Sequence, residues 1–124
     1  MQGDAVHELS IIVEIINTIE NELGSSKEDG SVVSLTLQIG EMSSIIPGYI
    51  REYYPEAVKD TILEGAELLI EVIPATAQCK ACDTQFGYTG SEGTCPECGG
   101  RKLKLLRGRE FFIKEIVLDS TVNK

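Results

Sequence analysis

The chain has 124 residues, of which 42% are hydrophobic and 25% are charged, and this is the composition of an ordinary globular protein. The length allows one compact unit, or a small domain with a still smaller one attached. No apolar run approaches the ~20 residues that a helix needs to span a bilayer. The amino terminus also lacks the cationic and apolar regions of a signal peptide. We therefore expect a cytoplasmic protein that has no role in the membrane.

The net charge of −9 is unevenly placed along the chain. Residues 1–78 carry 14 acidic and 3 basic side chains, whereas residues 79–109 carry 3 acidic and 6 basic ones. A nucleic-acid-binding protein normally presents a basic surface, and an acidic body repels phosphate. We therefore expect no nucleic-acid partner. The alternative readings of the basic strip are a solvated strand or a protein-docking patch; the strip comprises Arg101, Lys102, Lys104, Arg107 and Arg109.

The first half of the chain predicts a helix followed by a strand. Apolar residues recur at helical spacing over residues 6–23, and Gly24 ends the pattern before a polar loop over residues 27–30. Apolar and polar residues then alternate over residues 33–39, as in a half-buried strand. The predicted inward-facing residues of that strand are Val33, Leu35, Leu37 and Ile39.

The second half predicts a further helix and three strands. Pro47 opens the helix, and Pro55 inside it is expected to kink or split it. Strands are expected over residues 66–73, 102–107 and 111–118. The predicted fold class is therefore α+β: a three-stranded sheet with two helices on one face, plus an inserted zinc-knuckle (rubredoxin-like or zinc-ribbon) module. The expected domains are residues 1–76 with 108–124, and residues 77–107.

Four cysteines form two CxxC pairs that are separated by twelve residues: Cys79, Cys82, Cys95 and Cys98. Two such pairs at this separation typically build the two knuckles of a tetrahedral four-thiolate site for structural zinc. Pro96 and the following glycines suit the tight turn that a knuckle requires. All four thiolates would bind the ion, so no coordination position remains open for catalysis.

Three other roles are possible for cysteines in this pattern: disulfides, a redox dithiol and an iron site. Disulfides would need an oxidising compartment, which an export signal would indicate. A redox CxxC would sit between a strand and a helix, whereas these pairs lie in turns rich in Gly, Thr and Ser. A rubredoxin-like iron site stays open, because four thiolates in a tetrahedral array serve iron as well as zinc.

The single histidine, His7, precedes Glu8 near the start of the first predicted helix. Taken alone, this pair is a surface polar feature of a helix amino terminus. The sequence does not support a catalytic triad with a nucleophile and a histidine base, because the chain has one histidine and its cysteines are assigned to the metal site. The chain also contains neither GxxxxGK[ST] nor GxGxxG, so it shows no nucleotide-binding loop of its own. No catalytic residue is predicted, and we expect that the protein is not an enzyme.

The order of the motifs resembles the HypA/HybF family, the nickel metallochaperones of nickel–iron hydrogenase maturation. His7-Glu8-Leu9-Ser10 opens the helix and Ile39-Gly40-Glu41 ends the first strand; the two CxxC pairs and Gly108-Arg109-Glu110 follow. The resemblance implies structural zinc at the four cysteines. It also implies nickel held at His7 and Glu8, where the family begins Met-His-Glu, by the imidazole and backbone nitrogens. Nitrogen-rich ligand sets of this kind suit Ni(II).

One departure from the family pattern concerns the start of the chain. Here five residues and Val6 precede His7, so an α-amine at Met1 would be too far away to join a compact nickel ring with His7. We expect the natural start to lie at Val6, at a GTG codon decoded as methionine, with residues 1–5 extra.

The function that the resemblance implies is delivery of nickel to a hydrogenase large subunit, in concert with the GTP-hydrolysing partner of the maturation pathway. Zinc would be a structural cofactor and nickel a transient cargo. A homodimer is left open. The alternatives are a zinc-ribbon protein-interaction module with no nickel role, or a rubredoxin-like iron electron carrier.

Overall fold

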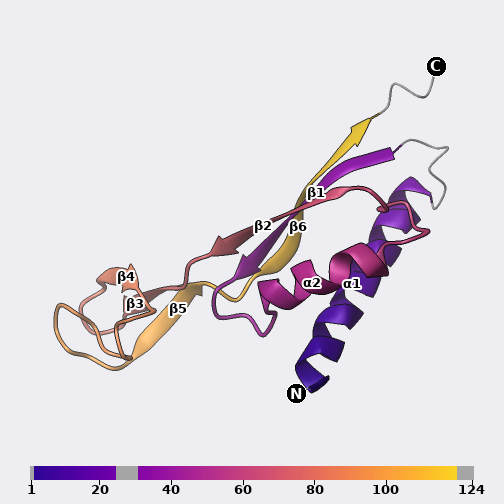
Figure 1. The fold of residues 1–124 in the computed structure, drawn as a ribbon. Coiled ribbons are helices and arrows are strands. Elements are labelled where there is room, and N and C mark those ends of the chain that lie inside the picture. Colours follow the sequence, from indigo (N-terminus) through magenta and orange to yellow (C-terminus); the bar gives the residue numbers. More distant parts are fainter. Residues whose placement is uncertain (1, 25–30, 120–124) are drawn as a thin grey trace. The chain divides into compact units, whose positions relative to one another are not determined.

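The computed structural model describes residues 2–24 and 31–119 of the chain (Figure 1). The polar loop predicted over residues 27–30 lies outside the described residues. No helix within the described ranges is long and apolar enough to cross a membrane. The elements in chain order are α1 (Gln2–Leu23), β1 (Ser31–Gly40), α2 (Pro47–Ala57), β2 (Glu67–Ile73), β3 (Thr76–Cys79), β4 (Gln85–Gly87), β5 (Leu103–Arg107) and β6 (Phe111–Asp119).

Helix α1 buries one apolar face and ends at a glycine. The buried positions recur at the three- and four-residue spacing of one helix face, and Gly24 closes the helix with a positive φ of 88° and an N–H bond to the Glu20 carbonyl. Leu9 and Val13 were read from sequence as part of the apolar pattern, yet they are 40% and 47% exposed. The buried face consists of Ile12, Ile15, Ile16 and Ile19.

Strands β2, β1 and β6 form one sheet in that order, and α1 and α2 lie on the same face of it (Figure 1). The predicted three-stranded sheet with two helices on one face is confirmed. Leu35, Leu37 and Ile39 of β1 are at most 1% exposed, as the alternation indicated. The prediction that Val33 also faces inward is wrong, because Val33 is 49% exposed and its neighbour Val32 is buried. Ser34 and Thr36 are buried as well, because β1 is the central strand and has a neighbour on each side.

Helix α2 was expected to kink or split at Pro55, but it runs unbroken from Pro47 to Ala57. Pro55 stands in the last turn, so the missing N–H removes only one bond close to the helix end. The Tyr54 hydroxyl, four residues before the C-cap, donates to the Ala66 carbonyl at 3.1 Å. Burial raises the pKa of Tyr54 to about 12.

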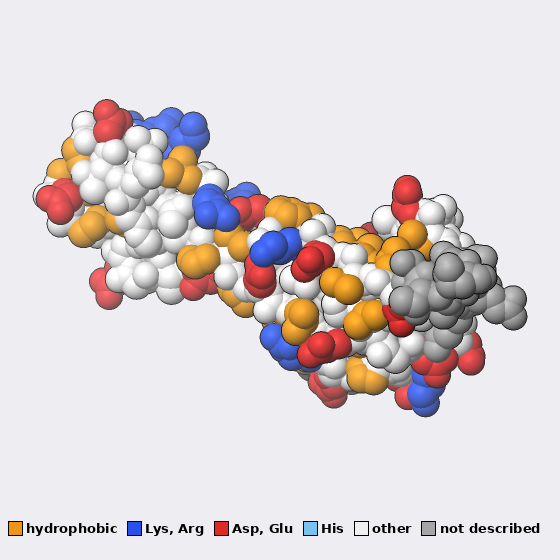
Figure 2. Space-filling view, turned by 90° about the horizontal axis from the view of Figure 1, so that it is seen from above, with side chains coloured by type: hydrophobic (Ala, Val, Ile, Leu, Met, Phe, Trp, Pro, Cys, Tyr) orange, Lys and Arg blue, Asp and Glu red, His pale blue; other side chains and the backbone are white. Residues whose placement is uncertain are grey.

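Strands β4, β3 and β5 form a second sheet, in which both neighbouring pairs are antiparallel. Only β5 was anticipated from the sequence. Strands β3 and β4 span four and three residues, which is too short for a period-two pattern to stand out. Lys and Arg side chains gather in Figure 2 at the left of the view, the end that carries this sheet in Figure 1.

The chain divides into two compact units. The helical unit comprises Met1–Leu37, Ile45–Ile70 and Ile113–Lys124, and the cysteine unit comprises Gln38–Ser44 and Glu71–Phe112. The divisions fall inside β1, β2 and β6, so one end of each of these strands belongs to the cysteine unit. The domain boundaries expected from the sequence stay a prediction.

Within the cysteine unit, three chain segments meet at two glycines. The Gly40 N–H donates to the Glu110 carbonyl at 2.7 Å, and the Met42 N–H donates to the Gly108 carbonyl at 2.6 Å. A Cβ on Gly40 would lie 2.1 Å from the Gly108 oxygen, and one on Gly108 would lie 2.7 Å from the Ala75 Cα. Both positions therefore require glycine. We call this place the three-segment junction; it comprises residues 40–42, 73–75 and 108–110.

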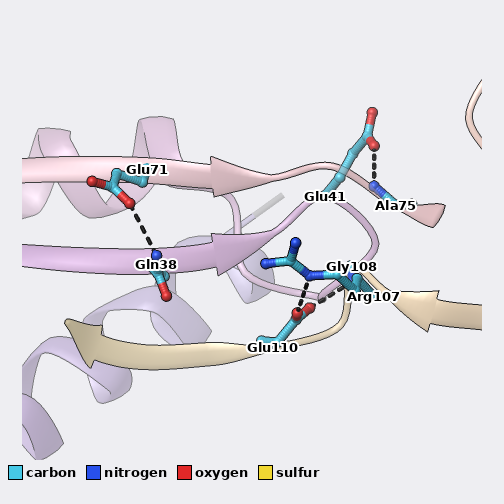
Figure 3. Close-up of polar contacts among 7 residues, drawn as sticks. All are labelled: Gln38, Glu41, Glu71, Ala75, Arg107, Gly108 and Glu110. Carbon is cyan, nitrogen blue, oxygen red and sulfur yellow. Dashed lines mark hydrogen bonds and ion pairs between the residues drawn. The ribbon is translucent and has the colours of Figure 1, made fainter. Parts of the chain in front are cut away.

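Two carboxylates accept backbone N–H groups at the junction (Figure 3). Glu41 Oε1 accepts from the Ala75 N–H at 2.7 Å, and this bond lowers the pKa of the Glu41 carboxyl, with help from the Thr89 side chain. Glu110 Oε1 accepts from the Gly108 N–H at 2.5 Å. Bonds to its own N–H and to that of Gly108, with the nearby Arg107 guanidinium, lower the pKa of Glu110. The Gly40-Glu41 and Gly108-Arg109-Glu110 motifs thus have a structural explanation.

Candidate metal centre

The two CxxC segments fold into knuckles with matching hydrogen bonds. In the first, the Cys79 N–H donates to the Thr84 carbonyl and the Asp83 N–H to the Cys79 carbonyl. In the second, the Cys95 N–H donates to the Gly100 carbonyl and the Gly99 N–H to the Cys95 carbonyl. In both knuckles, the carbonyl that accepts from the N–H of the first cysteine lies five residues after that cysteine. The N–H that donates to the carbonyl of the first cysteine lies four residues after it. Because two separate segments adopt the same loop, we attribute the loop geometry to the CxxC spacing that they share.

Each knuckle also points a backbone N–H at a sulfur and turns through a left-handed residue. The Ala81 N–H lies 3.4 Å from Cys79 Sγ, and the Glu97 N–H lies 3.4 Å from Cys95 Sγ. Asp83 has φ 66° and Gly99 has φ 76°, a conformation that glycine adopts freely and aspartate tolerates. The sequence pointed to Gly99 for this role, but the equivalent role of Asp83 was missed.

Gly100 is constrained by the sulfurs rather than by its backbone angles. A Cβ at this position would lie 3.3 Å from the Sγ atoms of both Cys79 and Cys98. A larger residue would therefore press against two of the four candidate ligands.

The four sulfurs lie together in one cage. One potential ligand atom from each of Cys79, Cys82, Cys95 and Cys98 lies within 4.8 Å of all the others. Two of the sulfur pairs, Cys79 with Cys98 and Cys82 with Cys95, are 3.6 Å apart. Zinc–sulfur bonds of about 2.3 Å in a tetrahedral array place the sulfurs about 3.8 Å apart. The cage therefore fits a tetrahedral metal ion, and none of the four cysteines is in a disulfide.

Two of the four cysteines have pKa values that are shifted in opposite directions. Bonds from the Thr84 side chain and backbone lower the pKa of Cys82 to about 6. The Gly100 backbone favours the Cys98 thiolate, but the Cys79 and Cys82 sulfurs and burial outweigh it and raise the pKa of Cys98 to about 12. Four thiolates this close repel one another, and a divalent ion removes that repulsion.

The structure places His7 and Glu8 on different sides of α1. His7 is exposed, whereas Glu8 is 1% exposed, and its Oε2 accepts the Ile46 N–H at 2.7 Å. Ile46 is the N-cap of α2, so the Glu8 carboxylate joins α1 to the start of α2. Its Oε1 is also buried and has no hydrogen-bond partner among the described residues. Among the described residues, the group of three or more potential metal ligands that lie close together is the four cysteines, and it does not include His7 or Glu8.

A family model described as "Hydrogenase/urease nickel incorporation, metallochaperone, hypA" matches residues 6–118. The chain belongs to the HypA family. A hydrogenase maturation factor HypA from Geobacter metallireducens is 32% identical, covering 92% of this chain and 100% of the relative. The corresponding factor from Chlorobium limicola is 34% identical, covering 92% of this chain and 97% of the relative. The family is named for metallochaperone activity in nickel incorporation rather than for a catalysed reaction.

Two solved structures share the fold. The solution structure of the Ni metallochaperone HypA from Helicobacter pylori matches with a TM-score of 0.57 and 16% identity, covering 90% of this chain and 96% of that one. Another solution structure of a HypA protein matches with a TM-score of 0.66 and 19% identity, covering 93% and 98%. The expected α+β fold with a four-cysteine module is therefore confirmed at the level of the fold.

Proposed function

We propose that this chain is a non-catalytic Ni(II) carrier that delivers nickel during maturation of a nickel–iron hydrogenase and holds a structural zinc ion at its four cysteines. The observation that carries the proposal is the HypA family match, which spans residues 6–118 and includes both the His7-Glu8 segment and the cysteine cage.

Zinc is the ion that we assign to Cys79, Cys82, Cys95 and Cys98. The cage offers four sulfurs at tetrahedral spacing and no ligand position for a substrate, which suits a structural ion. Binding in small zinc modules contributes on the order of 10 kcal/mol to folding. Zinc would therefore hold the segment that carries the cysteines folded, and we propose residues 77–107 as the bounds of that zinc domain. Iron is the rival, and metal analysis of protein from native source separates the two; an iron–tetrathiolate protein is red.

For nickel we propose the His7 imidazole and backbone nitrogens at His7 and Glu8 as ligands. Helix α1 begins at Gln2, so the N–H groups of these residues fall within helical turns. Coordination by amide nitrogens therefore requires the start of α1 to unwind. The bond from the Ile46 N–H to the Glu8 carboxylate would then keep the end of the unwound segment attached to the start of α2. A terminus of this kind both binds the ion and releases it to a partner.

The partners that we propose are the hydrogenase large subunit as recipient and the GTP-hydrolysing protein of the maturation pathway, acting in the cytoplasm. The second supplies the nucleotide chemistry for which this sequence has no phosphate-binding motif. The acidic net charge of −9 argues against nucleic acid as a partner.

The experiment that separates a carrier from a zinc-ribbon interaction module is Ni(II) titration of the zinc-loaded His7→Ala variant. Asn17→Ala, which changes another exposed position of α1, is the matched control. A carrier loses nickel binding in His7→Ala and retains it in Asn17→Ala. Unchanged nickel binding in His7→Ala would refute the assignment of His7.

A further inference from the structure

A groove of about 270 Å³ lies within the cysteine unit, on one face of the small sheet. Ala77 of β3 stands opposite Leu105 of β5, and Leu103 lies two residues earlier on the same strand. Residues two apart on a strand, and residues directly opposite one another on paired strands, point to the same face. These three side chains therefore form an apolar floor, of which Ala77 is fully buried and the two leucines are half-buried.

The groove is positively charged at its rim. Its charged lining residues are Arg101 and Arg109, and both are exposed. Among the described residues, neither guanidinium lies within ion-pair distance of a carboxylate; the nearby Glu110 pairs with Arg107 instead. Two exposed cations therefore lie beside the apolar floor, in a chain whose net charge is −9. A surface built this way attracts a ligand that is both acidic and apolar.

The backbone beside the groove favours an extended ligand. Strand β5 is an edge strand of the β4-β3-β5 sheet, so one row of its N–H and C=O groups has no strand beside it within that sheet. An added strand would place every second side chain over the groove and the others over the opposite face. On the opposite face, Lys104 stands across from Gln78.

We infer that this groove binds an extended segment of a partner protein whose groove-facing residues, which occupy every second position, are apolar in the middle and acidic at both ends. Apolar side chains would cover Leu103 and Leu105, and carboxylates would pair with Arg101 and Arg109. A bound nucleic acid fits less well, because two guanidinium groups neutralise few phosphates. The inference uses no nickel ligand and stands apart from the proposed nickel carriage.

The test is fluorescence anisotropy with the zinc-loaded full chain, without nickel, and a labelled peptide of sequence Glu-Ser-Val-Ser-Val-Ser-Glu, in which every second position carries a carboxylate or an apolar side chain. We expect saturable binding, and Arg101→Glu and Arg109→Glu should each weaken it about tenfold or more, since each loses a charge-assisted bond. Lys104→Glu is the matched control: the charge change is the same and the position lies in the chain between the two arginines, on β5, but the side chain lies on the other face. It should change the affinity by less than about threefold.

Each alternative has its own outcome. Equal losses in Lys104→Glu and Arg101→Glu would show undirected electrostatic attraction and overturn the proposal. Equal affinity for the same peptide with both valines replaced by serine would show that the apolar floor is not used, and would also overturn it. Absence of saturable peptide binding, or preference for a single-stranded oligonucleotide, would refute the groove as a protein-docking site. Zinc content and circular dichroism of each variant confirm that the cysteine unit is still folded.

Discussion

Replacing Gly40 by alanine should damage the three-segment junction severely. The new Cβ would lie 2.1 Å from the Gly108 oxygen, 2.3 Å from the Gly108 carbonyl carbon and 2.7 Å from the Arg109 nitrogen. All three are backbone atoms, so no side-chain rotation relieves the overlap. The segment at residues 108–110 would have to move by more than an ångström for ordinary contact to be restored.

The cost can be worked from the contacts that such a movement breaks. The Gly40–Glu110 and Met42–Gly108 backbone bonds would both be lost or stretched, at about 0.5–1.5 kcal/mol each. Overpacking adds about 1–3 kcal/mol. The sum is about 2–6 kcal/mol, against a total stability of about 5–15 kcal/mol for a typical domain.

The assay is urea unfolding of zinc-loaded protein, followed by far-ultraviolet circular dichroism at a fixed excess of zinc. Gly48→Ala is the control, because a Cβ there meets nothing within 4 Å and the residue lies inside α2. It should leave stability unchanged or raise it by up to about 1 kcal/mol. A Gly40→Ala variant within about 0.5 kcal/mol of the parent chain would refute the close approach at the junction.

Three further predictions concern the carboxylates and the cage. The folded-state pKa values of Glu41 and Glu110 are lowered, so their contribution is present above the ordinary carboxyl pKa of 4.5 and is lost as pH falls through the folded values. The stability difference between the parent chain and Glu41→Gln should therefore shrink as the pH falls below about 4.5; a difference that stays constant throughout the acid titration would contradict this. Glu8→Ala should lower the free energy of unfolding by about 1.5–3 kcal/mol through loss of the charged acceptor for Ile46, whereas an unchanged urea midpoint would show that the bond contributes nothing. Removal of the metal by a chelator should abolish the protection of β3–β5 amides in hydrogen exchange, and protection that survives metal removal would exclude a structural ion.

The features that the sequence predicted well are those carried by short-range patterns. The four cysteines lie within twenty residues, and each knuckle closes by bonds over four and five positions, so CxxC spacing suffices to indicate the cage. The alternation in β1 and the helical period in α1 likewise reflect which face is buried. The exposed side chains of Leu9 and Val13 show the limit of this prediction. The helical period indicates which face of α1 is buried, but the width of that face depends on the elements that pack against it.

The features that were missed depend on contacts between distant segments. Glu8 is buried because it bonds to Ile46, 38 residues away, whereas a carboxylate near a helix amino terminus is ordinarily solvated. Gly40 and Gly108 approach each other across 68 positions of sequence, and no local pattern encodes this. The one available signal was the repeated placement of glycine just before glutamate, at Gly40-Glu41 and Gly108-Arg109-Glu110.

The most direct test of nickel carriage is a Ni(II) titration of zinc-loaded protein that compares the full chain with a form trimmed to begin Met-His7-Glu8. Trimming places an α-amine beside His7 and supplies the nitrogen-rich ligand set that Ni(II) prefers. The account predicts that the trimmed form binds one nickel ion tightly, and that the full chain binds it equally well or more weakly, according to whether residues 1–5 obstruct the ligands. If neither form binds nickel, the carrier function is contradicted and the chain is a zinc-stabilised interaction module.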